Sequence, residues 1–169
     1  KNTTGSFSTS VGAESSCNGT TSHSNAALGY KALKLLTTGN HNVAIGREAM
    51  ISNTTGTRNT GIGAYALYGN TTAEANTAVG YSALETNTTG LCNTAVGDEA
   101  LGHGYEAGTA ITTGSGNVAI GVNSLYANTT ASNNTAIGLS ALEANTTGAD
   151  NTAVGANSLN KNTTGADNT

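Results

Sequence analysis

A unit of 17 residues is repeated along almost the whole chain. Every step between copies is 17 residues except the one from Asn93 to Asn117, which is 24 residues and holds seven extra residues within 102–111. A unit this short cannot bury an apolar face alone, so a constant period predicts rungs that stack on one another. The copies begin at Ser8, Asn25, Asn42, Asn59, Asn76, Asn93, Asn117, Asn134 and Asn151.

The residues of the unit favour β rungs over helical ones. A helical repeat needs roughly 30 or more residues for two helices and a turn, and each unit places a Gly after an aliphatic residue, which suits a helix interior poorly. We therefore expect an all-β protein, a parallel β-solenoid of 17-residue rungs that forms a single domain over residues 1–169. Nine full rungs start at residue 8, partial rungs occupy residues 1–7 and 168–169, and an inserted loop lies within 102–111.

Two apolar positions recur when the first residue of each unit is counted as offset zero. Because strand side chains alternate between two faces, the sequence predicts that the large aliphatic residue at offset three and the Leu or Met at offset eight form the core. Offset three holds Val11, Leu28, Ile45, Ile62, Val79, Val96, Ile120, Ile137 and Val154. Offset eight holds Leu33, Met50, Leu67, Leu84, Leu101, Leu125, Leu142 and Leu159.

Small residues (Ala, Ser or Gly) occupy offsets two and seven in every unit. If offset three points inward, these positions point outward. Two explanations are then open. Either another chain approaches closely along a flat stripe, or Ala simply suits an exposed, tightly curved rung.

Gly and Asn mark the corners of the rung. Gly stands at offset four in all nine units, where a left-handed corner or a close backbone approach requires a residue without Cβ. A second corner, Asn-Thr-Thr-Gly, recurs at residues 53–56, 87–90, 145–148 and 162–165 and has typical turn chemistry. The Asn at offset zero can pass amide hydrogen bonds from rung to rung as a ladder.

Several classes of function are excluded by composition and spacing. Only 9% of residues are charged and no basic run exists, which argues against nucleic-acid binding. No apolar stretch approaches the roughly 20 residues of a membrane span. No Cys–His metal spacing, phosphate-binding loop or nucleophile elbow is present. We therefore expect no enzyme activity, no catalytic residues, no metal and no cofactor.

Two features could carry interaction chemistry. The first is a set of Asn-x-Thr sequences, which are formal acceptors for N-linked glycans, although the same residues also suit a turn. These acceptors are Asn2, Asn18, Asn53, Asn70, Asn87, Asn128, Asn133, Asn145 and Asn162. The second is the inserted loop, where His103, Tyr105 and Glu106 form either a recognition loop or a tolerated surface insertion.

The motifs resemble those of known surface proteins. Asn-Val-Ala-Ile-Gly at residues 42–46 and 117–121, and Asn-Thr-Ala-Val-Gly from Asn76, Asn93 and Asn151, resemble the head repeats of YadA-like trimeric autotransporter adhesins. The longer form, which continues to Ala-Leu and Asn-Thr-Thr-Gly, is similar to repeats of phage and bacterial fibre proteins. The resemblance implies a left-handed parallel β-roll, commonly with three chains side by side. The unit here is longer than the adhesin repeat, and no binding residue is carried over.

The sequence thus predicts a structural component of an extracellular fibre or filament, with a role in surface display or adhesion at a cell or virion surface. Its expected partners are copies of itself, as a parallel trimer or an end-to-end filament, together with host or surface ligands. The alternative is an ice-binding solenoid that uses Thr ladders such as Thr54 and Thr55. Adjacent Thr residues at a turn point in different directions, however, whereas a flat ice-binding face favours Thr residues two apart on a strand.

Overall fold

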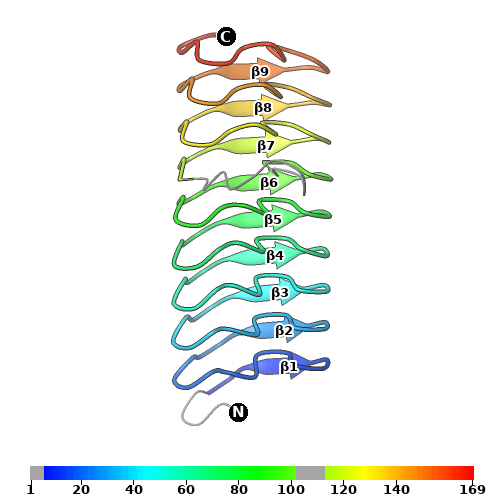
Figure 1. Ribbon diagram of the computed structural model, residues 1–169, viewed down its shortest axis with the longest axis vertical. Helices are drawn as coiled ribbons and strands as arrows, with labels where there is room; N and C mark the ends of the chain where they lie inside the picture. Colours follow the sequence, from blue (N-terminus) through cyan, green and yellow to red (C-terminus); the bar gives the residue numbers. More distant parts are fainter. Residues whose placement is uncertain (1–5, 102–112) are drawn as a thin grey trace.

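The computed structural model describes residues 6–101 and 113–169, and every repeat unit contributes one short strand to a single parallel sheet (Figure 1). The strands follow one another in the sheet in chain order, and the described residues contain no helix. Their bounds are β1 (Thr9–Val11), β2 (Ala26–Leu28), β3 (Val43–Ile45), β4 (Thr60–Ile62), β5 (Thr77–Val79), β6 (Thr94–Val96), β7 (Val118–Ile120), β8 (Thr135–Ile137) and β9 (Thr152–Val154). The predicted β-solenoid is confirmed.

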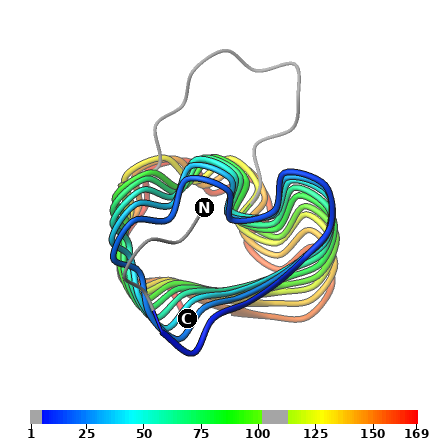
Figure 2. The same cartoon turned by 90° about the horizontal axis from the view of Figure 1, so that it is seen from below.

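The strands stack in the register that the repeat dictates. Thr77 of β5 lies beside Thr94 of β6, and Thr94 in turn lies beside Val118 of β7. The seven extra residues between these last two units therefore leave the register of the sheet unchanged. Seen along the long axis, the described coils lie over one another with nearly the same outline (Figure 2).

The strands face the opposite way from the prediction. Ala44 and Ala78 at offset two are fully buried, whereas Ile45 at offset three is 37% exposed. The prediction that offset three forms the core is therefore wrong. Val11, Leu28, Ile45, Ile62, Val96, Ile120, Ile137 and Val154 are exposed, and Val79 is partly exposed.

The interior of each coil is too narrow for a second large aliphatic side chain. The Leu or Met at offset eight already fills it: a Cβ added to Gly61 at offset two would lie 3.1 Å from Cγ of Met50. Offset seven also points inward, as the fully buried Ala49 and Ala83 show. The small residues at offsets two and seven are thus fixed by the chain's own interior, and neither explanation based on an outward-facing stripe holds. The buried residues at offset eight are Leu33, Met50, Leu67, Leu84, Leu101, Leu125 and Leu142, with Leu159 packed against them.

Each coil turns through several left-handed residues, only one of which is always Gly. In the unit that starts at Asn76, Gly80 has φ 139°, Ser82 has φ 51°, Leu84 has φ 52° and Cys92 has φ 57°. A left-handed residue other than Gly costs roughly 1–2 kcal/mol. The backbone N–H of Leu84 donates to the carbonyl of Ala100 in the next coil at 3.1 Å, so these residues are held in place by stacking.

The Gly at offset four is required by the next coil. A Cβ on Gly63 would overlap the carbonyl oxygen of Gly80 directly above it, and the φ of Gly63 is 135°. The prediction of a corner that only Gly can form is therefore confirmed at this position.

Candidate functional site

The outer face of the sheet is formed by the side chains at offsets one and three of β1–β9. We call this surface the strand face. Offset one holds Thr, Val or Ala, offset three holds Val, Leu or Ile, and neither holds a charged residue in any unit. From strand spacings, the face is about 10 Å wide and about 38 Å tall, roughly 400 Å². The face carries no charge, and its aliphatic residues at offset three stand beside Thr at offset one in six of the nine strands. The largest apolar patch on a single chain is often a functional surface.

Sequence reasoning missed this face because it placed the large side chains inside. One signal could have found it. Thr at offset one and Ile or Val at offset three must lie on the same face of the strand, and Thr60 and Thr77 are polar residues that suit an outer face. The residue at offset two is small in every unit, and this was a second signal because it indicates a tightly packed interior.

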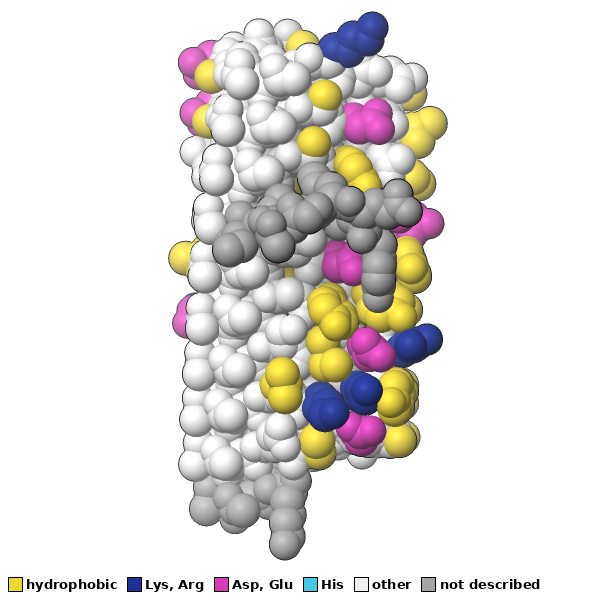
Figure 3. All heavy atoms as spheres, viewed as in Figure 1, with side chains coloured by type: hydrophobic (Ala, Val, Ile, Leu, Met, Phe, Trp, Pro, Cys, Tyr) yellow, Lys and Arg dark blue, Asp and Glu magenta, His cyan; other side chains and the backbone are white. Residues whose placement is uncertain are grey.

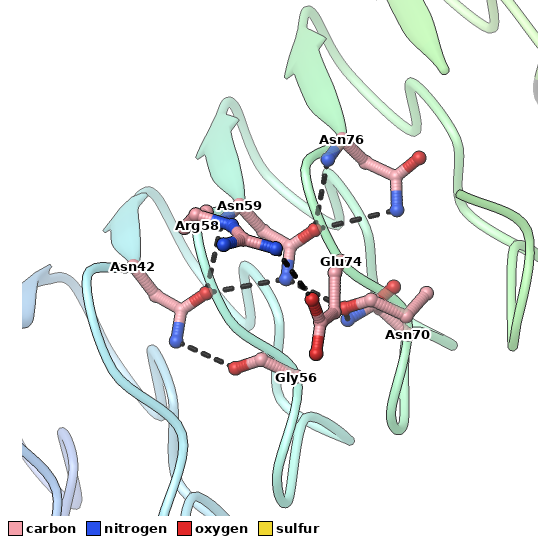
Figure 4. Close-up of polar contacts among 8 residues, drawn as sticks. Asn42, Gly56, Arg58, Asn59, Asn70, Glu74 and Asn76 are labelled. Carbon is pink, nitrogen blue, oxygen red and sulfur yellow. Dashed lines mark hydrogen bonds and ion pairs between the residues drawn. The ribbon is translucent and has the colours of Figure 1, made fainter. Parts of the chain in front are cut away.

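A column of buried Asn side chains holds the coils in register beneath this face (Figure 4). The Nδ2 group of Asn59 donates to Oδ1 of Asn42 at 3.2 Å and to the carbonyl of Ala73 at 2.8 Å. Its Oδ1 accepts from the backbone N–H of Asn76 at 3.0 Å and from Nδ2 of Asn76 at 3.3 Å. The predicted Asn ladder at offset zero is confirmed, and each amide both links neighbouring coils and closes its own coil.

A second Asn column lies inside the Asn-Thr-Thr-Gly corner, at offset eleven. Oδ1 of Asn53 accepts from the backbone N–H of Gly56 at 3.0 Å, and Nδ2 of Asn53 donates to the carbonyl of Gly56 at 3.2 Å. The same carbonyl accepts from Nδ2 of Asn42 at 2.8 Å. The two columns meet at one backbone acceptor in five coils, those that start at Asn42, Asn59, Asn76, Asn117 and Asn151.

This arrangement overturns most of the predicted N-glycosylation sites. An N-linked glycan is attached to Nδ2, and at offset eleven that atom points into the coil. The prediction is therefore wrong for Asn53, Asn70, Asn87, Asn128 and Asn145, which are at most 3% exposed. Asn18 and Asn133 are exposed, Asn162 is partly exposed, and Asn2 lies outside the described residues.

The paired Thr residues of the same corner have different environments. The hydroxyl of Thr54 at offset twelve donates to the backbone carbonyl of Thr71 in the next coil at 3.2 Å, and Thr54 is partly buried. Thr55 at offset thirteen is exposed. Of the two predicted Thr ladders, only the one at offset thirteen is exposed throughout, and a single column does not form a flat face.

Most of the charged side chains visible in Figure 3 lie toward the right, among hydrophobic ones. The ring of Tyr65 lies 5.7 Å from that of Tyr81, and the guanidinium of Arg47 lies 5.5 Å from the centre of the Tyr65 ring. Burial raises the pKa of the Glu85 carboxyl above its usual value, and a hydrogen bond from Ser82 acts in the opposite direction. These contacts occur in only a few neighbouring coils, so this cluster does not extend along the rod.

The remaining predicted site residues, His103, Tyr105 and Glu106, lie outside the described residues. Within residues 6–101 and 113–169, no helix could span a bilayer, and no three His, Cys, Asp or Glu side chains are placed to share a metal ion. No protein-family model, curated protein or solved structure matches the chain. Its function must therefore be inferred from its own surfaces.

Proposed function

We propose that this protein is a structural subunit of an extracellular fibre, and that copies of the chain pack side by side through the strand face. The observation that carries the proposal is the aliphatic residue at offset three, which is present in all nine units and exposed in eight of them, with no charged residue beside it at offset one. Exposed positions elsewhere on the rod carry charged residues such as Arg58 and Asp150. A surface that keeps an outward-facing aliphatic residue in every coil is best explained by burial against a partner.

A second copy of the chain fits this surface better than an unrelated partner does. The ridges of the strand face repeat at about 4.8 Å, and an identical chain offers the same repeat over the same length. A parallel arrangement around a symmetry axis buries every strand face equally, and the resemblance of the repeats implies three chains. Roughly 400 Å² per chain is small for a stable interface, but the area grows with each added rung, so a longer array binds more tightly.

Two variants of neighbouring residues test the assembly. Ile120 is on the strand face and 39% exposed, whereas Val122 is off that face and 44% exposed. We expect the chain and its Val122→Glu variant to form the same oligomer in light scattering and native mass spectrometry. Ile120→Glu should be monomeric with an unchanged far-ultraviolet circular dichroism spectrum, because it buries a charge at the contact.

The proposal is wrong if the unmodified chain is monomeric at all concentrations, or if both variants keep its oligomeric state. The extracellular location rests on the resemblance of the repeats and needs a separate test. Protease treatment of intact cells or virions should remove the protein, and protection of the whole population would contradict a surface location.

Ice binding is the second candidate, and one observation favours it. Thr at offset one and the aliphatic residue at offset three lie two apart on the same strand and both face outward, as in Thr60 and Ile62. Six of the nine strands have this Thr. An ice-binding chain should be monomeric and show thermal hysteresis that Ile120→Glu abolishes and Val122→Glu does not. A fibre subunit should lack hysteresis.

A further inference from the structure

The nine coils show which residues the fold itself requires. Every repeat places a residue in the same environment, so a position that always keeps one residue type has a constant requirement. The buried Asn and Ala positions are explained by the contacts described above. Exposed corner positions vary instead: offset sixteen holds His41, Arg58, Ala75 and Cys92 in consecutive units, and all four are exposed.

Offset thirteen is the exception among the exposed positions. It is Thr in every unit, and the side chain is exposed in every unit, at the edge of the rod formed by the Asn-Thr-Thr-Gly corners. We call this set the Thr column. Its members are Thr21, Thr38, Thr55, Thr72, Thr89, Thr113, Thr130, Thr147 and Thr164.

The fold gives no reason for a hydroxyl in the Thr column. The backbone N–H of Thr38 donates to the carbonyl of Thr54 at 3.2 Å, and any residue other than Pro could supply that bond. The preceding Thr37 does use its hydroxyl, which donates to the same carbonyl at 2.9 Å. Among the described residues, the hydroxyls of Thr38 and Thr55 have no protein partner. No contact within the described chain therefore accounts for these hydroxyls.

We propose that the Thr column is a modification site at which sugars are attached through Oγ1. A transferase would bring a nucleotide-activated sugar to the exposed edge. The Thr oxygen forms a bond to the anomeric carbon as the bond from that carbon to the diphosphate breaks. The hydroxyl proton passes to a base of the transferase, and the nucleoside diphosphate leaves. This inference does not depend on the proposed assembly, since the column lies away from the strand face.

The surroundings favour neutral sugars over phosphate. Each phosphate carries a charge of about −1.5 to −2, and neighbours in the column would be only about 4.8 Å apart. No Lys or Arg occurs at offsets eleven to fifteen in any unit to neutralise them. The left part of the surface in Figure 3 is mostly white, the colour of uncharged polar side chains and backbone, with a few Asp or Glu side chains along its margin and no Lys or Arg.

The Asn at offset eleven cannot take the sugar instead, because its amide is buried and bonded to its own corner. The coil that starts at Asn25 best separates attachment to Asn from attachment to Thr, because the fully buried Leu36 stands at offset eleven in place of Asn. A sugar on this coil must be attached to a hydroxyl. Thr37 and Thr38 are then the competing sites, one partly buried and bonded, the other exposed.

The test is mass spectrometry of the protein from its native source, denatured and digested with trypsin. Cleavage after Lys34, Arg47 and Arg58 releases residues 35–47 and 48–58, which contain one column member each. We expect both peptides to be heavier by at least one sugar residue than those of the chain expressed without a transferase. Electron-transfer fragmentation should place the sugar on Thr38 and Thr55.

A Thr38→Val variant made in the native host supplies the matched control. It should lose the sugar from residues 35–47 and keep it on residues 48–58, because Val preserves the side-chain shape without the hydroxyl. Unmodified peptides from the native protein would overturn the inference. A sugar found on Thr37, Asn53 or Thr54, or an added group that is not a sugar, would do so as well.

Discussion

Replacing Asn59 with Ala should destabilise the rod more than any substitution of an exposed residue. The side chain of Asn59 makes four hydrogen bonds, two to the coil of Asn76 and one each to Asn42 and Ala73. Asn42, Asn59 and Asn76 are fully buried, and Ala73 is 1% exposed. Their polar groups therefore have no water to replace the lost partner.

The magnitude follows from counting the groups left without partners. The backbone N–H of Asn76 loses its acceptor. The carbonyl of Ala73 keeps only the long contact from Nδ2 of Asn70, at 3.5 Å. Oδ1 of Asn42 still accepts from the backbone N–H of Asn59 at 3.0 Å. A buried polar group without a partner costs about 1–3 kcal/mol, so two such groups predict a loss of about 2–5 kcal/mol in the free energy of unfolding.

The assay combines guanidinium unfolding with hydrogen exchange of the Asn76 amide. Asn18→Ala is the matched control, because Asn18 is an exposed Asn whose backbone is not left-handed, so its replacement should change stability by about 0.5 kcal/mol or less. The Asn76 amide should exchange faster in the Asn59 variant only. A loss below about 1 kcal/mol, or unchanged protection of that amide, would refute the idea that the Asn column carries stability.

Three further substitutions test the interior, the corner and the charged edge. Ala78→Leu should cost about 3 kcal/mol or more in unfolding free energy, since Ala78 is fully buried in an interior already filled; tolerance of Leu would contradict the narrow core. Gly63→Ala should be far more damaging than Gly155→Ala, because both have positive φ but only Gly63 meets the next coil; equal losses would show that backbone strain alone matters. Burial raises the pKa of Glu85, so the protonated form is favoured in the folded state, and this stability is present below the ordinary pKa of 4.5 and lost as the pH rises through the folded value. Glu85→Gln should therefore raise the unfolding midpoint at pH 7 and leave it unchanged near pH 3, and a similar rise for Glu143→Gln, at the same offset of another coil, would argue against burial as the cause.

The repeat period predicted most of the fold, and the physical reason is its strictness. Identical units must occupy identical environments, so the strand at offsets one to three and the Gly corner recur in all nine units, and the Asn of the ladder recurs in every unit but the first, which has Ser8. The Leu at offset eight also has only one place to go, as Leu84 shows by being fully buried. None of these inferences required knowing which way the strand faced.

Alternation alone could not show which face of the strand points inward. For that reason the sequence did not reveal the strand face as the candidate site. A period of two separates Ala78 from Val79 but does not say which is inside. The usual preference for burying the larger residue fails here because one Leu fills each coil from the other side. The Asn-Thr-Thr-Gly corner was ambiguous for a similar reason, since a glycan acceptor and a self-bonded turn have the same sequence.

The buried Asn amides give the rod a net dipole along its axis. At offset zero, Nδ2 of Asn42 donates back to Asn25, that of Asn59 to Asn42 and that of Asn76 to Asn59. The dipoles of these amides therefore add along the axis, as peptide dipoles do in an α-helix, with the positive end at the first coils. An amide column can continue from one rod into another only when both columns point the same way along the axis. Any filament built by such stacking would be polar, with two chemically different tips.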